Sequence, residues 1–259
     1  MGINDLDLSR WRDYGHILTD SLWLLGNRAK RLHATGDFHG NFVPQIPEQM
    51  LLRYTKEGDT VLDLFTGAGT TFYECLRLKR NFIGVDINEA TIEALTKHIA
   101  TLDNVDINWN LINGDSSKKK IKAEIRKYAN PVQHVFMHPP YWDIIKFSEL
   151  DDDLSNTETL EEFLEMFNLV IKNAYYLLEK GRYATIVMGD KYHKGEWIPL
   201  GFYCMKLAME AGFTLKSICV KDIAGNEKGK GVNTNLWRYR SLNGGFYIFK
   251  HEYILILKK

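Results

Sequence analysis

Residues 138–142, with the sequence HPPYW, have the groups that would bind a flat ring carrying an amino group. Two consecutive prolines cannot continue a β-ladder, so they end a strand and hold a rigid loop. Because proline has no N–H, the loop presents mainly carbonyl acceptors to the hydrogens of an amine. Tyr141 or Trp142 can stack on the ring. The loop follows an apolar run at 134–138, which places it at the carboxyl edge of a parallel sheet, where ligands bind.

A second segment, residues 61–71 (VLDLFTGAGTT), joins an apolar run to a helix through two glycines. Gly67 and Gly69 have no Cβ, so a ligand could approach the backbone closely. The helix that follows offers unpaired N–H groups to a polar ligand. Phe72 stands where the third glycine of a dinucleotide-binding GxGxxG would lie. The turn therefore favours an adenosine-type ligand other than NAD.

Three aspartates, Asp63, Asp86 and Asp115, end or follow successive apolar runs. An acidic residue at the end of the second strand is placed to bind ribose hydroxyls, which assigns Asp86 to the ribose. Asp115 could accept the amino group of adenine. One such aspartate alone is more often a helix cap. Their order along the chain is what favours an adenosine site.

These segments together resemble the amino-methyltransferase family of DNA methylases, which modify adenine at N6 or cytosine at N4. In that family a DxFxGxGTT-like segment binds S-adenosylmethionine and a (D/N/S)PP(Y/F/W) loop binds the target amine. The similarity covers roughly residues 38–190, with a proline-containing segment at 42–47 that would close over the methionine end of the cofactor. It implies the cofactor-binding residues Asp63, Phe65, Gly67, Gly69, Thr70, Asp86, Asp115 and Pro47, and the catalytic residues His138, Pro139, Pro140 and Tyr141.

His138 departs from the family pattern, which has Asp, Asn or Ser at this position. A neutral imidazole has one acceptor nitrogen for the amine, and a protonated imidazole has none. We therefore expect activity to fall on the acid side, near pH ~6.5 unless the site shifts the pKa of His138. The target base stays open, because small polar residues resemble the cytosine branch and Asp the adenine branch, and His is neither.

DNA is the expected partner, with the target base flipped out of the duplex. The formal net charge of zero does not favour a nucleic-acid binder, but residues 221–250 lean basic. Arginine and asparagine read base edges, and aromatic rings stack on bases. The segment is short for a recognition domain, so a homodimer or a partner subunit could complete DNA binding. The candidate substrate-binding residues are Trp142, Asn235, Trp237, Arg238 and Arg240.

The elements that would position these residues alternate between short apolar runs and helical periodicity from residue 59 onward. This alternation predicts an α/β fold with a doubly wound, mostly parallel, seven-stranded Rossmann-like sheet and an antiparallel C-terminal strand. The predicted strands are 60–65, 82–86, 106–110, 134–138, 184–189, 214–220 and Phe246/253–257. The predicted helices are 70–79, 89–100, 117–128, from Thr159 to near Gly181, and 198–212.

Residues 1–55 are predicted to be an N-terminal extension that packs on the core, and residues 56–259 a methyltransferase domain. Within that domain, 221–250 is a possible DNA-recognition insertion. Three widely spaced cysteines without CxxC spacing predict neither a disulfide framework nor a metal site. The chain shows no apolar run of the ~18 residues that a membrane span needs and no signal-peptide core, so we expect no membrane partner and a cytoplasmic location.

Two alternatives stay open. Methylases of RNA bases and of protein glutamine side chains also use an (N/D)PPY loop on this scaffold, so either could be the substrate class. A catalytically decayed DNA-binding subunit is the non-enzymatic alternative, since His138 differs from the family residue. The glycine turn and Asp86 favour an intact cofactor site.

Overall fold

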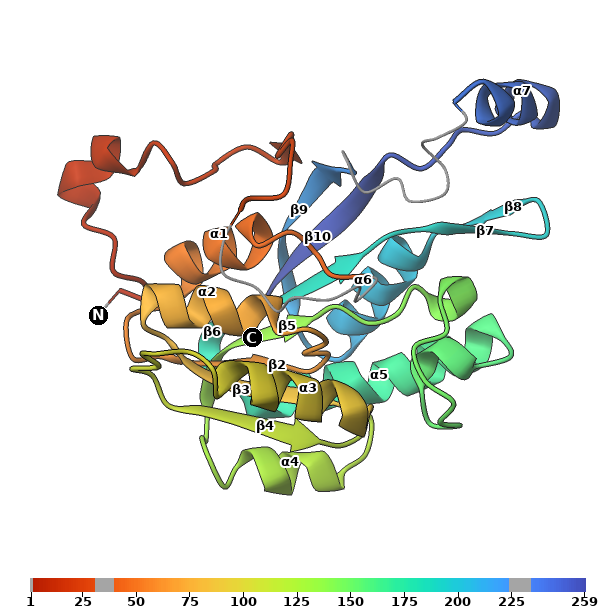
Figure 1. Cartoon of the computed structure of the whole chain (residues 1–259). Helices are drawn as coiled ribbons and strands as arrows, with labels where there is room; N and C mark the ends of the chain where they lie inside the picture. Colours follow the sequence, from red (N-terminus) through yellow and green to blue (C-terminus); the bar gives the residue numbers. More distant parts are fainter. Residues whose placement is uncertain (1, 31–39, 224–233) are drawn as a thin grey trace.

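The computed structural model describes residues 2–30, 40–223 and 234–259, and for 234–237 it describes the backbone alone. At its centre is an eight-stranded sheet with the order β1-β9-β10-β6-β5-β2-β3-β4 (Figure 1). The strands from β4 to β6 are parallel, β10 is antiparallel to both of its neighbours, and the short β1 is parallel to β9. The strands are β1 (Leu22–Trp23), β2 (Thr60–Asp63), β3 (Asn81–Asp86), β4 (Trp109–Asn113), β5 (Val132–Met137), β6 (Leu178–Met188), β9 (Thr214–Asp222) and β10 (His251–Lys258).

This topology confirms the predicted fold class, a doubly wound and mostly parallel sheet with an antiparallel C-terminal strand. β1 is an additional strand beside the seven predicted ones. The last two strands, β9 and β10, are antiparallel as expected, and β10 lies between β6 and β9.

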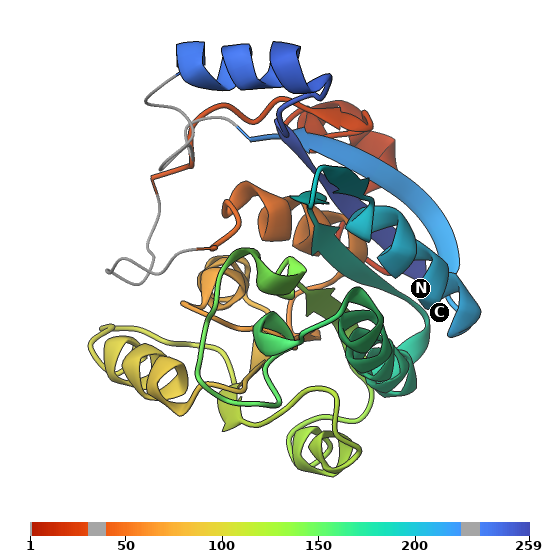
Figure 2. The same ribbon diagram turned by 90° about the vertical axis from the view of Figure 1, so that its right-hand side faces the viewer.

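Helices cover both faces of the sheet (Figure 2). On one face α1, α2 and α3 bury side chains such as Ile46, Phe72 and Leu95 against the strands. On the other face α4, α5 and α6 bury side chains such as Phe167 and Cys204. The helices are α1 (Gln45–Tyr54), α2 (Thr70–Leu78), α3 (Glu89–Ile99), α4 (Lys120–Ile125), α5 (Leu160–Leu177) and α6 (Leu200–Glu210).

The apolar run in β10 follows from this two-sided burial. Ile254 and Ile256 belong to the core under α1–α3, and Leu255 and Leu257 belong to the core under α4–α6. A strand covered on both faces needs apolar residues at successive positions. Glu252 shares the parity of Ile254 and so lies on the α1–α3 side, at the end of the strand nearest the site described below.

Several predicted boundaries were wrong. The strand predicted at 184–189 begins at Leu178, the helix predicted at 117–128 is Lys120–Ile125, and Phe246 lies outside the last strand. The helix that begins at Thr159 has the expected capping box with Glu162, but it ends at Leu177 and the chain enters β6 directly. Gly181 lies inside β6 and does not end the helix. The strand predicted at 106–110 is β4, which begins three residues later, at Trp109, because Phe82 of β3 pairs with Trp109.

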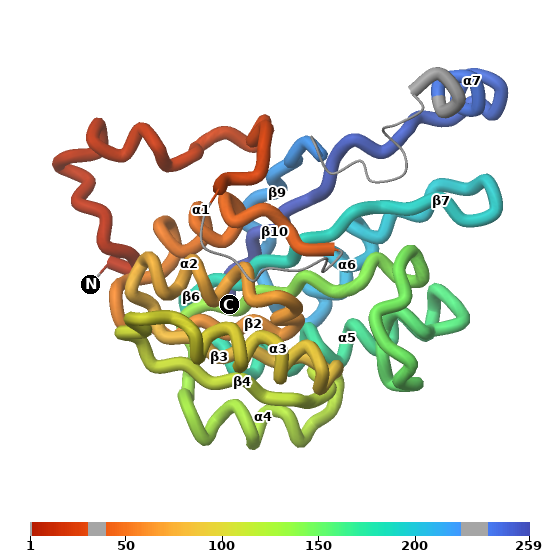
Figure 3. Tube along the Cα trace, viewed as in Figure 1, coloured from red at the N-terminus to blue at the C-terminus, as the bar shows by residue number. Residues whose placement is uncertain are grey.

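Two elements outside the sheet were not predicted. β7 (Lys191–His193) and β8 (Glu196–Ile198) form a hairpin that extends beyond the sheet (Figure 3). α7 (Thr234–Gly244) lies between β9 and β10, inside the possible DNA-recognition insertion. Among the helices of the described ranges, none is long and apolar enough to span a membrane.

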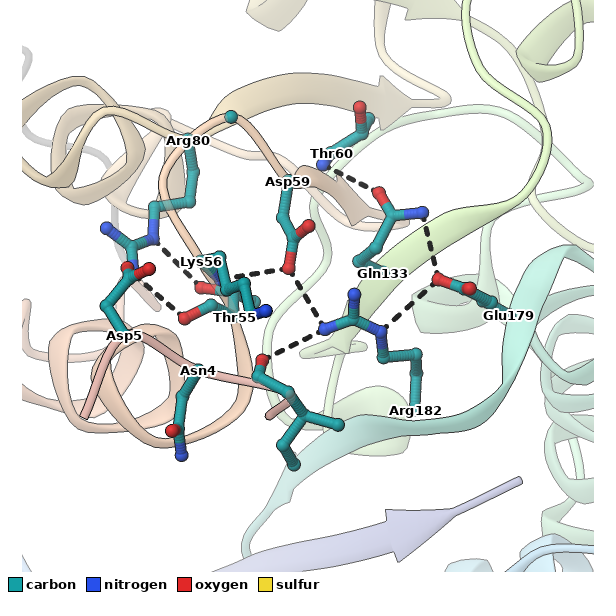
Figure 4. Close-up of polar contacts among 12 residues, drawn as sticks. Asn4, Asp5, Thr55, Lys56, Asp59, Thr60, Arg80, Gln133, Glu179 and Arg182 are labelled. Carbon is teal, nitrogen blue, oxygen red and sulfur yellow. Dashed lines mark hydrogen bonds and ion pairs between the residues drawn. The ribbon is translucent and has the colours of Figure 1, made fainter. Parts of the chain in front are cut away.

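A polar network holds the first described residues against the amino-terminal edge of the sheet (Figure 4). The guanidinium of Arg80 donates to Asp5 Oδ2 at 2.8 Å. The guanidinium of Arg182 donates to Ile3 O at 2.9 Å and to Asp59 Oδ2 at 3.0 Å. This edge is opposite to the one at which the predicted site residues lie, so the network supports the fold without entering the site.

Candidate active site

A cavity of about 280 Å³ lies at the carboxyl edge of β2, β3, β4 and β5. Both chemically distinctive segments of the sequence contribute to its wall, although they are about 70 positions apart along the chain. The predicted site residues that line it are Phe65, Gly67, Thr70, Asp86, Asp115, His138, Pro139, Pro140 and Tyr141.

The glycine turn between β2 and α2 needs both glycines, for different reasons. Gly67 has a φ of 51° and lines the cavity, where its N–H donates to Asp86 Oδ2 at 2.9 Å. Gly69 has a φ of 80° and caps α2. A Cβ on Gly69 would lie 2.6 Å from Leu95 Cδ1, so this position is required by the packing of α2 against α3. Gly69 does not itself line the cavity in the described structure.

Asp63 supports the turn from below. It is buried, its Oδ1 accepts the N–H of Phe65 at 3.0 Å, and its Oδ2 accepts the hydroxyl of Thr71 at 2.5 Å. Burial raises the pKa of Asp63 to about 6. Asp63 does not line the cavity. Its hydrogen bonds instead hold the glycine turn, which would contact the cofactor.

Asp86 ends β3 and lines the cavity. Its Oδ1 accepts the N–H of Asn88 at 3.0 Å, and its Oδ2 accepts that of Gly67. Burial raises the pKa of the carboxyl group. A carboxylate has about four acceptor positions, so two hydroxyl groups of a ribose can still bind.

Asp115 follows β4 and has an acceptor without a hydrogen-bond partner. Its Oδ1 accepts the N–H of Ser117 at 2.7 Å, whereas Oδ2 is buried and no described group donates to it. Lys118 Nζ lies 3.5 Å from Oδ2, which is a charge contact at the limit of hydrogen-bond distance. A buried orphan acceptor costs free energy unless a ligand donates to it. The amino group of adenine would fit, so the residues suit an adenosine cofactor.

The loop of residues 138–142 begins where β5 ends. His138 Nε2 lies 3.1 Å from the hydroxyl of Tyr141, and the ring of Phe42 contacts the imidazole edge to face at a centroid distance of 4.9 Å. Burial lowers the pKa of His138 to about 4. The imidazole is therefore neutral at pH 7 and retains one acceptor nitrogen.

Two residues that the sequence reasoning missed complete the loop. The hydroxyl of Tyr141 donates to Glu252 Oε2 at 3.0 Å, and Lys221 Nζ lies 3.0 Å from Glu252 Oε1. Both residues line the cavity. The sequence feature that pointed to Glu252 was a single acidic residue at the start of the apolar final strand, HEYILIL. For Lys221 it was a lysine at the end of the preceding strand.

Pro47 and Trp142 lie away from the cavity wall of the described residues. Pro47 is buried in the first turn of α1, and Phe42 and Val43 of the same segment line the cavity instead. Trp142 is 4% exposed, its indole N–H donates to Thr157 O at 3.2 Å, and it packs in the core. Trp142 therefore has no open ring face for a base, contrary to the stacking role expected for it.

Of the described residues in the basic segment, Lys221 and Ile223 at its start line the cavity, and those of α7 do not. Arg238 and Arg240 lie on α7, which stands apart from the sheet in Figure 1, and Arg238 is exposed. Asn235 and Trp237 are on the same helix, but their side chains lie outside the described residues. The proposed roles of these four residues stay predictions.

The profile of a family described as DNA methylase matches residues 9–97 and 132–259, which is most of the chain. The sequence is 39% identical over 61 residues to the type II methyltransferase M.MjaII of Methanocaldococcus jannaschii, which is 24% of this chain and 12% of that protein. It is 30% identical over 98 residues to the type II methyltransferase M.BglI of Bacillus subtilis, which is 38% of this chain and 26% of that protein. Each alignment thus spans about a quarter or less of the relative.

Solved structures show the same fold at low sequence identity. TrmN from Thermus thermophilus superposes with a TM-score of 0.54 at 17% identity, over 85% of this chain and 50% of that one. A SAM-dependent methyltransferase from Methanosarcina mazei superposes with a TM-score of 0.50 at 13% identity, over 78% of this chain and 93% of that one. These likenesses establish the methyltransferase fold.

Proposed function

Because the chain belongs to the DNA methylase family, we propose that it transfers a methyl group from S-adenosylmethionine to the exocyclic amino nitrogen of cytosine (N4) or adenine (N6) in DNA. Family membership implies S-adenosylmethionine as the cofactor. The observation that carries the proposal is the single cavity that joins the glycine turn and Asp86 to the loop of His138 and Tyr141.

The cofactor would lie across the ends of β2, β3 and β4. Asp86 would hold the ribose, Asp115 would accept the adenine amino group at Oδ2, which has no hydrogen-bond partner among the described residues, and Phe65 would contact the ring. When bound, the cofactor supplies a methyl group already activated on a sulfonium. What the protein adds is the in-line placement of that group and the amine, for which effective molarities reach ~10⁵ M or more.

The target amine is a poor nucleophile because its lone pair is delocalised into the ring. Hydrogen bonds from its two hydrogens to the side chain of His138 and the carbonyl of Pro139 would favour a tetrahedral, more nucleophilic nitrogen. The low pKa of His138 supports this role, because a neutral imidazole is required to accept. Neither proline can donate a competing N–H.

The base must leave the duplex to reach the cavity, at a cost of a few kcal/mol. Stacking on Tyr141, which lines the cavity, would return about 1–3 kcal/mol. Trp142 cannot share this role because it is buried in the core. The proposed reader of the surrounding sequence is α7 with its arginines, completed by a second copy or a partner subunit.

Transfer of labelled methyl from S-adenosylmethionine to duplex DNA, RNA or protein, followed by mass spectrometry of the nucleosides, tests the proposal. N6-methyladenine or N4-methylcytosine in DNA would support it and identify the base. Label confined to RNA or protein would replace DNA with that substrate class. Failure to bind S-adenosylmethionine in calorimetry would indicate a decayed subunit. The matched control is Asp86→Ala, which removes the ribose acceptor and leaves the catalytic loop in place.

A further inference from the structure

Four side chains on the cavity wall form a hydrogen-bonded series that ends in an ion pair. His138 Nε2 lies 3.1 Å from Tyr141 Oη, and Tyr141 Oη donates to Glu252 Oε2 at 3.0 Å. Lys221 Nζ lies 3.0 Å from Glu252 Oε1. The hydrogen-bonded series thus connects a buried ion pair to the imidazole of His138, which faces the proposed amine site.

The sheet positions the ion pair of Lys221 and Glu252. Lys221 of β9 and Glu252 of β10 are direct cross-strand partners, and their side chains are 8% and 10% exposed. With the lysine ammonium beside it, Glu252 is a carboxylate, and a carboxylate can only accept hydrogen bonds.

The charge of Glu252 determines which atom donates in each hydrogen bond of the series. Tyr141 has one hydroxyl hydrogen, and that hydrogen points to Glu252. Only lone pairs of the Tyr141 oxygen then face His138, so His138 Nε2 must carry the ring hydrogen. A neutral imidazole has a single N–H, which leaves Nδ1 with a lone pair.

We propose that Glu252, acting through Tyr141, is a positioning residue that holds His138 in its Nε2–H tautomer and so makes Nδ1 the acceptor for the target amine. Lys221 keeps Glu252 in place. That the target amine is the group that donates a hydrogen bond to Nδ1 rests on the proposed function. No residue of the described ranges makes a hydrogen bond to Nδ1, and His138 lines the cavity.

The arrangement accounts for the histidine in this motif. An oxygen of Asp or Asn accepts a hydrogen bond whatever its neighbours are, whereas an imidazole accepts only at the nitrogen without a hydrogen. A histidine can replace such an oxygen only when another group selects its tautomer. Phe42 packs edge to face on the ring of His138 and limits the ring flip that would put Cε1 in place of Nε2 and Cδ2 in place of Nδ1.

The chain also contains a matched control. His251 Nε2 lies 3.1 Å from Tyr253 Oη, and Tyr253 Oη lies 3.2 Å from Asp190 Oδ2. This His–Tyr–carboxylate set has nearly the same distances, and its residues are absent from the cavity wall. Tyr253→Phe therefore removes the same kind of hydroxyl from a β10 residue that does not line the cavity.

The first experiment measures the tautomer directly, by ¹⁵N NMR of the full chain labelled at histidine, with His138→Asn to assign the signal. Wild-type His138 is expected to show Nε2 protonated and Nδ1 unprotonated. Tyr141→Phe and Glu252→Gln are expected to shift His138 to a mixture of tautomers, and Tyr253→Phe to change His251 alone. A wild-type His138 protonated at Nδ1, or one that keeps Nε2–H in both variants, would overturn the proposal.

The second experiment is a double-mutant cycle on methyl transfer. Tyr141→Phe and Glu252→Gln should each lower kcat by about 3- to 10-fold, the size of one net hydrogen bond, with cofactor binding unchanged. In a His138→Asn background Glu252→Gln should have no further effect, because an amide oxygen needs no tautomer selection. An equal loss in both backgrounds would give Glu252 a structural role only. Absence of wild-type transfer to DNA would refute the proposed function, while the NMR measurement would still decide the tautomer.

Discussion

At His138 the surroundings decide whether the side chain can accept a hydrogen bond at all. Transfer from water to the buried loop disfavours the imidazolium, which lowers the pKa of His138 to about 4, although the charge of Glu252 acts in the opposite direction. This balance could not be predicted from the sequence, because Glu252 is more than 100 positions away from His138. The motif was readable from 138–141, but its protonation state depends on a strand at the far end of the chain.

The pH dependence of methyl transfer follows from that pKa. The neutral imidazole accepts and the imidazolium does not, so the rate should be constant from pH 8 to about 5 and fall as the pH drops through about 4. Single-turnover rates across this range, with cofactor binding measured at each pH, check the prediction. An acid limb centred near pH ~6.5, the ordinary value for histidine, would contradict it.

The folded fraction must be followed in the same experiment. His134 and His138 are held neutral in the folded chain, with pKa values of about 3 and about 4, whereas both would charge near 6.5 when unfolded. The unfolded state therefore binds more protons between these values, and stability falls as the pH drops below about 6.5. Circular dichroism separates this loss from loss of the acceptor.

Tyr141→Ala tests the stacking role at the same scale. Removing the ring should lower methyl transfer about 10- to 100-fold, in line with about 1–3 kcal/mol for a base stacked on an aromatic ring. Binding of S-adenosylmethionine should be unchanged, because Asp86 ends β3 and Asp115 follows β4, whereas Tyr141 follows β5. Rates and calorimetric affinities measured on the same preparation check this, and a parallel loss of affinity would move Tyr141 to the cofactor site.

At the scale of elements, the ends of strands position the site. β2, β3 and β5 are well predicted because each is a buried apolar run that stops at a polar or proline residue. β7, β8 and α7 are not, since two three-residue strands and a helix in a glycine-rich segment have no strong periodicity. The long-range pairing of β9 with β10 brings Lys221 to Glu252, and one sequence does not specify that register.

Gly189, which follows β6, tests how closely a strand end holds the catalytic loop. A Cβ at this position would lie 2.6 Å from Tyr141 Cε2, so Gly189→Ala must displace the ring. We expect at least a tenfold lower kcat, with cofactor affinity preserved. Gly15→Ala is the control, because a Cβ there meets nothing within 4 Å. Unchanged kcat in Gly189→Ala would mean that the ring position is not critical.

At the scale of the whole molecule, the residues that stabilise the fold and the residues of the proposed site lie at opposite edges of the sheet. The cavity lies at the carboxyl edge, and the network of Arg80 and Arg182 lies at the amino edge (Figure 4). α1 and β1, which come from the first 55 residues, belong to the same core as the sheet. The division at residue 55 stays a prediction.

Arg182→Met should therefore destabilise the fold without changing the site. The guanidinium bonds to Asp59, Glu179 and Ile3 O, and hydrogen bonds to charged groups contribute about 1.5–3 kcal/mol. We expect a loss of about 2–3 kcal/mol in chemical denaturation and an unchanged affinity for S-adenosylmethionine. The control Lys97→Met breaks an exposed pair with Glu93 and should cost less than about 0.5 kcal/mol. A weaker cofactor affinity in Arg182→Met would show that the two edges are coupled.

The insertion of β10 between β6 and β9 has a consequence for the order of folding. The glycine turn, Asp86 and the loop of His138 are all complete once β2 to β6 have paired, whereas Glu252 arrives only when the last strand enters the sheet. Tyr141 and Glu252 are 111 positions apart, and contacts between residues so far apart in sequence form slowly, since a long loop must close first. A partly folded chain could thus bind its cofactor before His138 has a defined acceptor nitrogen. Competence to react would then be the last property that the folding molecule acquires.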